Sequence, residues 1–160
     1  MAWRDELTGL SGEPLDTAML AGRTVLVVNV ASQCGLTPQY EGLERLQRRY
    51  GGDRFTVLGV PCDQFAGQEP GTPEEIQAFC STTYGTTFPL TAKFDVNGRS
   101  RHSLYAWLTS TPDVDGRAGE VEWNFEKFLV SPSDQVLARF RPAVEPEDGR
   151  VIEAIEHALL

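Results

Sequence analysis

Two short stretches of the chain are almost continuously apolar: TVLVVNV at Thr24–Val30 and FTVLGV at Phe55–Val60. Runs of this length, rich in β-branched residues, are typical of strands that are buried on both faces of a sheet. Pro38–Tyr50 lies between them with helical spacing, because its large apolar residues share one stripe: Tyr40, Leu43, Leu46 and Tyr50. A strand, a helix and a second strand in this order predict a right-handed parallel crossover.

The ends of two helices can be predicted from capping residues. Thr37 is expected to cap the first helix, with Pro38 at its first position and Gly51-Gly52 at its end. A second helix is expected over Thr72–Thr83, because Thr72, Pro73 and Glu75 together make a capping-box start.

The second half of the chain has weaker patterns. Leu90–Val96 predicts a weak strand, and His102–Thr109 predicts a short helix. Phe125–Val130 and Gln135–Phe140 are separated by a turn and predict an antiparallel hairpin. Val151–Leu160 predicts a final helix with one apolar face.

The order of these elements indicates an α/β fold. Three alternations of strand and helix, then a hairpin and a closing helix, predict a central mixed β-sheet flanked by α-helices. The order matches a thioredoxin-like arrangement, although periodicity alone leaves other α/β folds open. The sequence contains no repeat, low-complexity tract or linker, so we expect residues 1–160 to form one domain.

The charge balance is acidic, with 23 acidic against 14 basic side chains and a formal net charge of -9. Such a surface repels phosphate backbones, so we expect no nucleic-acid partner. The N-terminal segment has neither an apolar run nor a basic leader, and no apolar stretch is long enough to span a bilayer. We therefore expect a cytoplasmic protein without integral membrane association.

The chain has three cysteines, Cys34, Cys62 and Cys80. A small odd number in a chain of 160 residues does not indicate a disulfide framework. No pair of cysteine or histidine residues has the short spacing of a zinc site, so no metal and no cofactor is expected. Each of the three thiols is therefore either a structural residue of the core or a reactive group of the site.

Cys34 is the cysteine whose position points most clearly to chemistry. It follows the first predicted strand and precedes the first predicted helix. Sites in open α/β sheets form at the carboxyl ends of strands, and a helix N-terminus favours a thiolate. The alternative is a buried cysteine with only a structural role.

Three longer segments carry a family resemblance. They read NVASQCGLTPQY at Asn29–Tyr40, LGVPCDQFAGQEPG at Leu58–Gly71 and WNFEKFLV at Trp123–Val130. In this order they closely resemble motifs of the glutathione peroxidase family, and with weaker matches the resemblance covers roughly residues 24 to 142. It implies a thioredoxin-like fold and a peroxidase of the cysteine-containing type.

The resemblance also implies roles for four residues. Cys34 stands where the family places its peroxidatic selenocysteine or cysteine, and Gln68, Trp123 and Asn124 stand where it places the polar groups around that atom. Amide and indole N–H groups aimed at sulfur stabilise a thiolate over a thiol. Taken alone, Trp123 is an ordinary core aromatic and Gln68 an ordinary loop amide, so the joint motif carries the assignment.

Cys80 is the candidate resolving cysteine. FCSTTYGTTFP, from Phe79, resembles the pattern of non-animal members that carry such a cysteine and are typically reduced by thioredoxin. A disulfide needs Cα atoms within about 7 Å, so we expect the Cys80 helix to unwind partly to reach Cys34. The modest helix propensity of its Ser and Thr residues would ease that opening.

The resemblance thus implies a thiol peroxidase that reduces hydrogen peroxide and organic or lipid hydroperoxides through a Cys34 sulfenic acid, which Cys80 resolves and thioredoxin regenerates. Two alternatives stay open: a one-cysteine enzyme reduced by glutathione, and a peroxide sensor that oxidises a partner's thiol. A peroxiredoxin is disfavoured because Ala31 replaces its Thr, and a thioredoxin-type reductase because Thr37 replaces its second Cys.

The chain departs from the family's pattern in places. Asp63 stands where Asn is usual, and the Thr109–Val121 segment lacks the inserted loop of tetrameric members, so we expect a monomer. No evident basic cluster is available to grip glutathione. The residue at position 34 is either a native cysteine or a replacement of selenocysteine. The presence of Cys80 favours a native cysteine. Cys62 is interpreted as structural.

Overall fold

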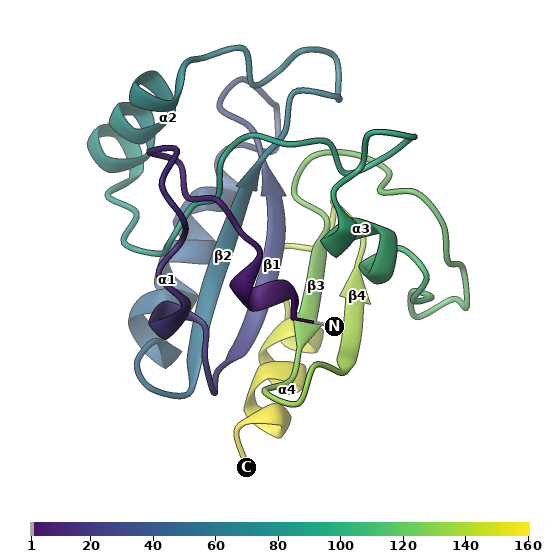
Figure 1. The fold of residues 1–160 in the computed structure, drawn as a ribbon. Helices are drawn as coiled ribbons and strands as arrows, with labels where there is room; N and C mark the ends of the chain where they lie inside the picture. Colours follow the sequence, from purple (N-terminus) through teal and green to yellow (C-terminus); the bar gives the residue numbers. More distant parts are fainter. Residues whose placement is uncertain (1) are drawn as a thin grey trace.

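A mixed four-stranded sheet forms the centre of the molecule in the computed structural model, which describes residues 2–160 (Figure 1). Its strands are β1 (Thr24–Val30), β2 (Phe55–Pro61), β3 (Lys127–Val130) and β4 (Val136–Phe140). They lie in the order β2-β1-β3-β4. β1 pairs with β2 in parallel, whereas β1 with β3 and β3 with β4 pair in antiparallel fashion.

The two central apolar runs are strands because both of their faces are covered. Every residue of β1 and β2 is buried. Side chains alternate between the faces of a strand, so a strand covered on both sides needs apolar residues at consecutive positions. The predicted bounds of β1 are confirmed, and those of β2 fall one residue short of its end.

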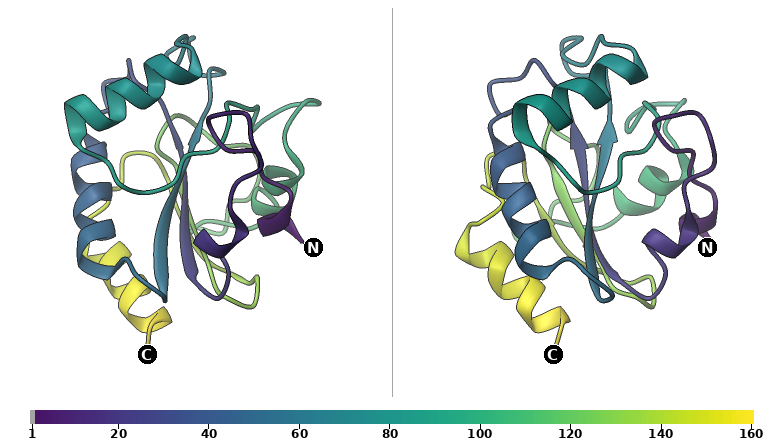
Figure 2. Two further views of the ribbon diagram at one scale, coloured as in Figure 1. Left: turned by 60° about the vertical axis from the view of Figure 1, so that its left-hand side comes forward. Right: turned by 90° about the vertical axis from the view of Figure 1, so that its left-hand side faces the viewer.

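Helices cover both faces of the sheet. α1 (Gln39–Tyr50) and α4 (Gly149–Ala158) lie against one face, and α3 (Ser103–Leu108) lies on the other with the N-terminal turns η1 (Trp3–Asp5) and η2 (Thr17–Met19) (Figure 2). The core is divided accordingly. Leu26 and Val28 of β1 belong to the cluster that includes α1 and α4, whereas Val25 and Val27 belong to the cluster that includes α3.

The second helical segment changes its geometry part of the way along. α2 (Pro73–Phe79) begins with the predicted capping box, in which Thr72 and Glu75 each accept the other's backbone N–H. It continues as η3 (Cys80–Tyr84), a turn of π-helix that ends at Gly85 in the left-handed conformation, with φ of 61°. The predicted helix thus extends one residue beyond Thr83, but from Cys80 onward it is not an α-helix.

The predicted strand at Leu90–Val96 is wrong. The segment forms one bridge with β2, where Gly59 donates to the Pro89 carbonyl and accepts from the Thr91 N–H. Leu90 lies so close to Gly59 that a Cβ there would come within 2.5 Å of its side chain. Beyond this bridge the Ala92 N–H donates to Thr8 in the N-terminal segment and the Phe94 N–H donates to Pro61 at the end of β2, so no continuous ladder forms.

Other differences concern element ends. Thr37 does not cap α1, because its hydroxyl bonds within the preceding turn instead. β3 begins two residues later than predicted, because Phe125 has a positive φ of 67° that a strand does not allow. His102 caps α3 through Nδ1, which accepts the Leu104 N–H.

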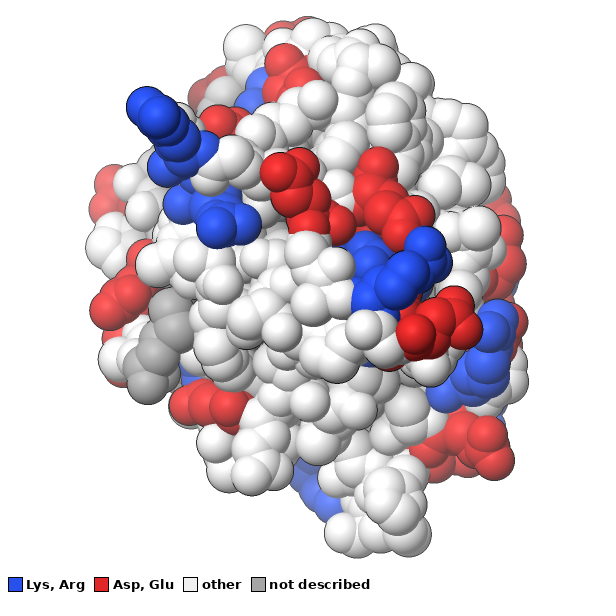
Figure 3. Space-filling view, turned by 90° about the vertical axis from the view of Figure 1, so that its right-hand side faces the viewer, with Lys and Arg blue, Asp and Glu red and all other residues white. Residues whose placement is uncertain are grey.

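Charges of both signs are interspersed on the face that carries α3 (Figure 3). Acidic and basic side chains lie beside one another there, with no broad basic surface in view. None of the helices in residues 2–160 is long and apolar enough to cross a membrane.

Candidate active site

Cys34 lies in the turn between β1 and α1, at the carboxyl end of β1, and is 8% exposed. The Leu36 N–H donates to its Sγ at 3.3 Å. The Cys34 N–H donates to Thr37 Oγ1 at 2.9 Å, and the Thr37 hydroxyl donates to the Ala31 carbonyl at 2.8 Å. The turn is therefore fixed by its own hydrogen bonds, and one of them is directed at the sulfur.

Gln68 lies next to this turn. The Gln33 N–H donates to the Gln68 carbonyl at 3.0 Å, which joins the loop after β2 to the loop after β1. The side-chain oxygen of Gln68 accepts from the Asn124 amide, also at 3.0 Å. Two of the predicted site residues, 56 positions apart in sequence, are thus directly bonded.

Trp123 and Asn124 are held in place by Asn29 of β1. The Asn29 amide donates to the Trp123 carbonyl at 3.0 Å, and the Asn29 carbonyl accepts from the Phe125 N–H at 2.7 Å. Phe125 is a non-glycine residue in the left-handed region, an unfavourable conformation that persists only where its surroundings enforce it. Asn124 is fully buried, and no partner for its Oδ1 lies within the described residues.

The Trp123 indole is half-buried and packs against both core clusters. Its ring centroid lies 5.5 Å from that of Phe65, in the loop after β2. The structure therefore gathers the Trp123 segment, the loop that carries Gln68 and the Cys34 turn. In the part of the chain described, the hydrogen bond at Cys34 Sγ comes from Leu36, and none joins Sγ to the side chains of Gln68, Trp123 or Asn124.

Cys80 is the first residue of η3, fully buried and part of the same core cluster as Cys34. Burial raises the pKa of the Cys80 thiol; the polar side chains of Tyr40 and Thr86 act against this rise, and the negative charge of Glu69 adds to it. The thiol is therefore protonated at neutral pH. Cys34 and Cys80 are both free in this structure.

Cys62 follows β2 and belongs to the other core cluster, across the sheet from Cys34 and Cys80. Its thiol donates to Gln64 Oε1 at 3.5 Å, and burial raises its pKa. A buried, protonated thiol on the opposite face is poorly placed to react with Cys34. This placement supports the interpretation of Cys62 as structural.

Asp63 has a defined contact that sequence reasoning did not find. Its Oδ1 accepts the Glu69 N–H at 2.9 Å, so the carboxylate fixes the loop that carries Gln68 and Glu69. Glu69 was also missed, although it lies within the quoted motif. Its Oε1 accepts from the N–H and hydroxyl of Ser32, two residues before Cys34, at 3.1 and 2.6 Å. Sequence offers no signal that separates such a buried carboxylate from a solvated one in a loop.

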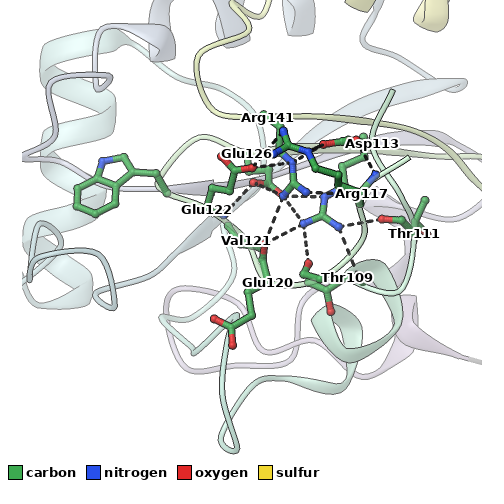
Figure 4. A network of polar contacts seen from close by, with 12 residues as sticks. Thr109, Thr111, Asp113, Arg117, Glu120, Val121, Glu122, Glu126 and Arg141 are labelled. Atoms are coloured by element: carbon green, nitrogen blue, oxygen red, sulfur yellow. Dashed lines mark hydrogen bonds and ion pairs between the residues drawn. The ribbon is translucent and has the colours of Figure 1, made fainter. Parts of the chain in front are cut away.

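An ion network that includes Glu122, Glu126 and Arg141 holds the two ends of the segment that contains Trp123 (Figure 4). Arg139 and Glu126 form a pair at 2.7 Å in which neither side chain is exposed. Arg141 joins Glu126, at 3.1 Å, to Glu122 and Asp113, at 3.0 and 2.9 Å. Arg139 also donates to carbonyls of the loop after α3. The network therefore attaches that loop to both ends of the segment containing Trp123 and Asn124.

A groove of about 590 Å³ begins at Gly35 and Leu36, directly after Cys34. Pro146 contributes an apolar wall on its far side. Four carboxylates line it: Glu41, Glu145, Glu147 and Asp148. Arg45 also lines the groove, but its guanidinium is paired with Glu147 at 2.7 Å. The groove that begins at the two residues after Cys34 is therefore predominantly acidic.

Comparison with known proteins agrees with this geometry. Residues 4–109 match the family model described as glutathione peroxidase. The chain is 48% identical to the hydroperoxy fatty acid reductase Gpx2 of Synechocystis sp., over 96% of both chains. It is 44% identical to the thioredoxin/glutathione peroxidase BtuE of Escherichia coli, over 94% of this chain and 92% of that protein.

Solved structures give the same result. The crystal structure of Trgpx in its apo form superposes with a TM-score of 0.72 at 35% identity, covering 98% of this chain and 97% of that one. A thioredoxin-family thiol:disulfide interchange protein of Chlorobium tepidum superposes with a TM-score of 0.63 over 96% of this chain and 91% of that one, and at 16% identity it supports the fold alone. With its thioredoxin-like fold and these relatives, the chain belongs to the glutathione peroxidase family and is a peroxidase.

Proposed function

We propose that the protein reduces hydrogen peroxide and organic or lipid hydroperoxides by a two-cysteine cycle, with Cys34 as the attacking thiol, Cys80 as the resolving thiol and thioredoxin as the reductant. The observation that carries the proposal is the position of Cys34 at the carboxyl end of β1. There its sulfur receives a backbone N–H beside the bonded pair of Gln68 and Asn124.

The first step is attack by the Cys34 thiolate on a peroxide oxygen. An S–O bond forms, the O–O bond breaks, and the leaving oxygen takes a proton to become water or an alcohol. The Leu36 N–H stabilises negative charge on the sulfur. Gln68, Trp123 and Asn124 carry N–H donors, and we assign these to the developing charge on the leaving oxygen. The hydrogen bond between the Gln68 and Asn124 side chains fixes the orientation of both amides for that role.

The second step joins Cys80 to Cys34. The Cys80 thiol attacks the sulfenic sulfur, an S–S bond forms, the S–O bond breaks, and water leaves. Cys80 begins the π-helical turn of η3, and single π-helical turns are rare and often lie at functional sites. Ser81, Thr82 and Thr83 of this turn are exposed, so its opening has to release only the two residues at its ends, the buried Cys80 and Tyr84, which packs on Tyr40. We propose that η3 opens to bring Cys80 to Cys34.

The acidic groove favours thioredoxin over glutathione. Glutathione carries two carboxylates, and a groove lined by carboxylates with a paired arginine disfavours it. The name of BtuE, thioredoxin/glutathione peroxidase, includes thioredoxin among the reductants of a relative. HYR1 of Saccharomyces cerevisiae, 45% identical over 92% of this chain and 90% of that protein, is named a glutathione peroxidase-like peroxiredoxin. The name of Gpx2 extends the proposed substrates to fatty acid hydroperoxides.

The test is coupled turnover measured as NADPH consumption. Purified protein is given hydrogen peroxide or cumene hydroperoxide, with thioredoxin and its reductase in one series and glutathione and its reductase in another. We expect turnover with thioredoxin that is lost in Cys80→Ser and kept in Cys62→Ser, the matched control.

Glutathione-driven turnover that survives Cys80→Ser would contradict the proposal and indicate a one-cysteine enzyme. Formation of mixed disulfides with a partner protein, without multiple turnovers, would indicate a peroxide sensor instead.

A further inference from the structure

Glu69 is a fully buried carboxyl group that neither step above uses. One of its oxygens is occupied, since Oε1 accepts both hydrogen bonds from Ser32 in the Cys34 turn. The other oxygen, Oε2, is buried and finds no partner among residues 2–160. Burying an oxygen of a carboxylate without a hydrogen-bond partner costs folding free energy. Such an oxygen is therefore a candidate for a functional role.

A small cavity of about 180 Å³ connects Glu69 to the segment that carries Cys80. Ser32 lines it from the Cys34 turn, and Ile76 and Phe79 line it from α2. Phe79 directly precedes Cys80. Glu69 is therefore placed between the segments that carry the two cysteines.

The neighbours of Glu69 include two buried proton donors. The charge of its carboxylate is close enough to raise the pKa of the Cys80 thiol and that of the Tyr40 hydroxyl, although burial has the larger effect on both. The Tyr40 hydroxyl is buried as well, and Tyr40, Cys34 and Cys80 share one core cluster. A buried carboxylate with one unpartnered oxygen thus lines a cavity whose wall includes Phe79, the residue before the thiol that must lose a proton.

We propose that Glu69 is the proton acceptor for Cys80 in the second step, an inference that rests on the two-cysteine cycle proposed above. The Glu69 carboxylate takes the proton of the Cys80 thiol, and the thiolate forms an S–S bond to Cys34. The S–O bond of the sulfenic acid breaks, and the departing hydroxide takes the proton from Glu69 and leaves as water. Glu69 returns to its charged form, and no further reactant is needed.

The surroundings of Glu69 adjust its basicity. Burial raises its pKa above the ordinary value of 4.5, and the negative charge of Asp63 adds to this rise. The hydrogen bonds from Ser32 and the positive charge of Lys93 act in the opposite direction. Glu75, from α2, lines the same cavity. A raised pKa makes the carboxylate a stronger base toward a thiol.

Two variants separate the catalytic role from a structural one. Below the pKa of Glu69 the carboxyl is protonated and cannot accept a proton, so disulfide formation slows as pH falls through it. Ser32→Ala removes a hydrogen bond that lowers the pKa of Glu69. The pH below which disulfide formation slows is therefore higher in this variant. Glu69→Gln keeps an oxygen for Ser32 but has no base, so the pH dependence disappears.

The experiment is rapid mixing of the reduced protein with a slight excess of hydrogen peroxide, acid quenching, alkylation of free thiols and peptide mass spectrometry. It gives the rates of sulfenic acid and disulfide formation separately, at several pH values. In Glu69→Gln we expect the ratio of the second rate to the first to fall about 100-fold. In Ser32→Ala we expect the pH dependence of the second step to shift upward.

A Glu69→Gln protein that forms the disulfide at the wild-type rate, or that slows both steps equally, would overturn the role of Glu69 while the two-cysteine cycle stands. If Glu69→Gln does not fold, an unshifted pH dependence in Ser32→Ala overturns it instead. A wild-type protein that forms no bond between Cys34 and Cys80 overturns the cycle, and the role of Glu69 with it.

Discussion

At the scale of single residues, the motifs of the sequence predict four residues of the candidate site. Cys34, Gln68, Trp123 and Asn124 were selected because their motifs resemble those of the family, and the structure gathers the segments that carry them. Glu69 could not be selected, because its importance comes from burial, which depends on packing between distant segments.

The proposed role of Gln68 gives a prediction at this scale. Gln68→Ala removes a donor near Cys34 and the acceptor of the Asn124 amide, so we expect the second-order rate constant for Cys34 oxidation by hydrogen peroxide to fall about 100-fold. Rapid-mixing kinetics in a Cys80→Ser background measures that constant without the second step.

Gln47→Ala is the matched control for Gln68→Ala. Gln47 is also an amide that accepts a hydrogen bond, from the Val57 N–H at 2.8 Å, but it belongs to α1 and bonds to β2. We expect this variant to lose about 1 kcal/mol of stability and to keep its oxidation rate. An equal loss of rate in both variants would contradict the role assigned to Gln68.

At the scale of elements, the bounds of a strand can be predicted where burial on both faces requires apolar residues at consecutive positions. β1 was predicted with its correct bounds because all seven of its residues are buried, and the capping box of α2 was predicted from Thr72 and Glu75. The predicted strand at Leu90–Val96 is wrong because its backbone forms one bridge, at Gly59, and then bonds alternately to Thr8 and to the end of β2. The change to π-helix at Cys80 was missed because propensities of neighbouring residues do not encode it.

The flexibility of η3 gives a prediction at this scale. Thr82 and Thr83 are exposed, so replacing both by Ala stabilises a helical turn by about 1 kcal/mol without disturbing the core. If η3 must open for the second step, disulfide formation slows about fivefold in this double variant. Thr82→Gly is the converse variant and speeds the step. Rates that do not respond to either change would show that opening of η3 does not limit the step.

At the scale of the whole molecule, the mixed sheet and the two-sided cover of helices follow from the order of elements, and the thioredoxin-like fold is confirmed. The ion network around Glu126 and Arg141 cannot be predicted from the sequence, because Asp113, Glu126 and Arg139 come from separate segments. It joins the loop after α3 to the sheet and to the segment of Trp123 (Figure 4).

Asp113 gives this network a pH dependence. Hydrogen bonds from the Arg117 backbone and the Arg141 side chain lower the pKa of Asp113 from 3.8 to about 2. Its stabilising effect is therefore complete above pH 4 and is lost as pH falls toward 2. We expect Asp113→Asn to be less stable than wild type at pH 7 and to lose less stability between pH 4 and 2. Urea denaturation at each pH measures this, and parallel curves would contradict it.

The most direct test of the whole account is the identity of the bond formed after one equivalent of hydrogen peroxide. The reduced protein is oxidised, its remaining thiols are alkylated, and its peptides are analysed by mass spectrometry. The two-cysteine cycle predicts a disulfide between Cys34 and Cys80, with Cys62 recovered as an alkylated thiol. Cys80 recovered as a free thiol beside an oxidised Cys34, or a disulfide that contains Cys62, would contradict it.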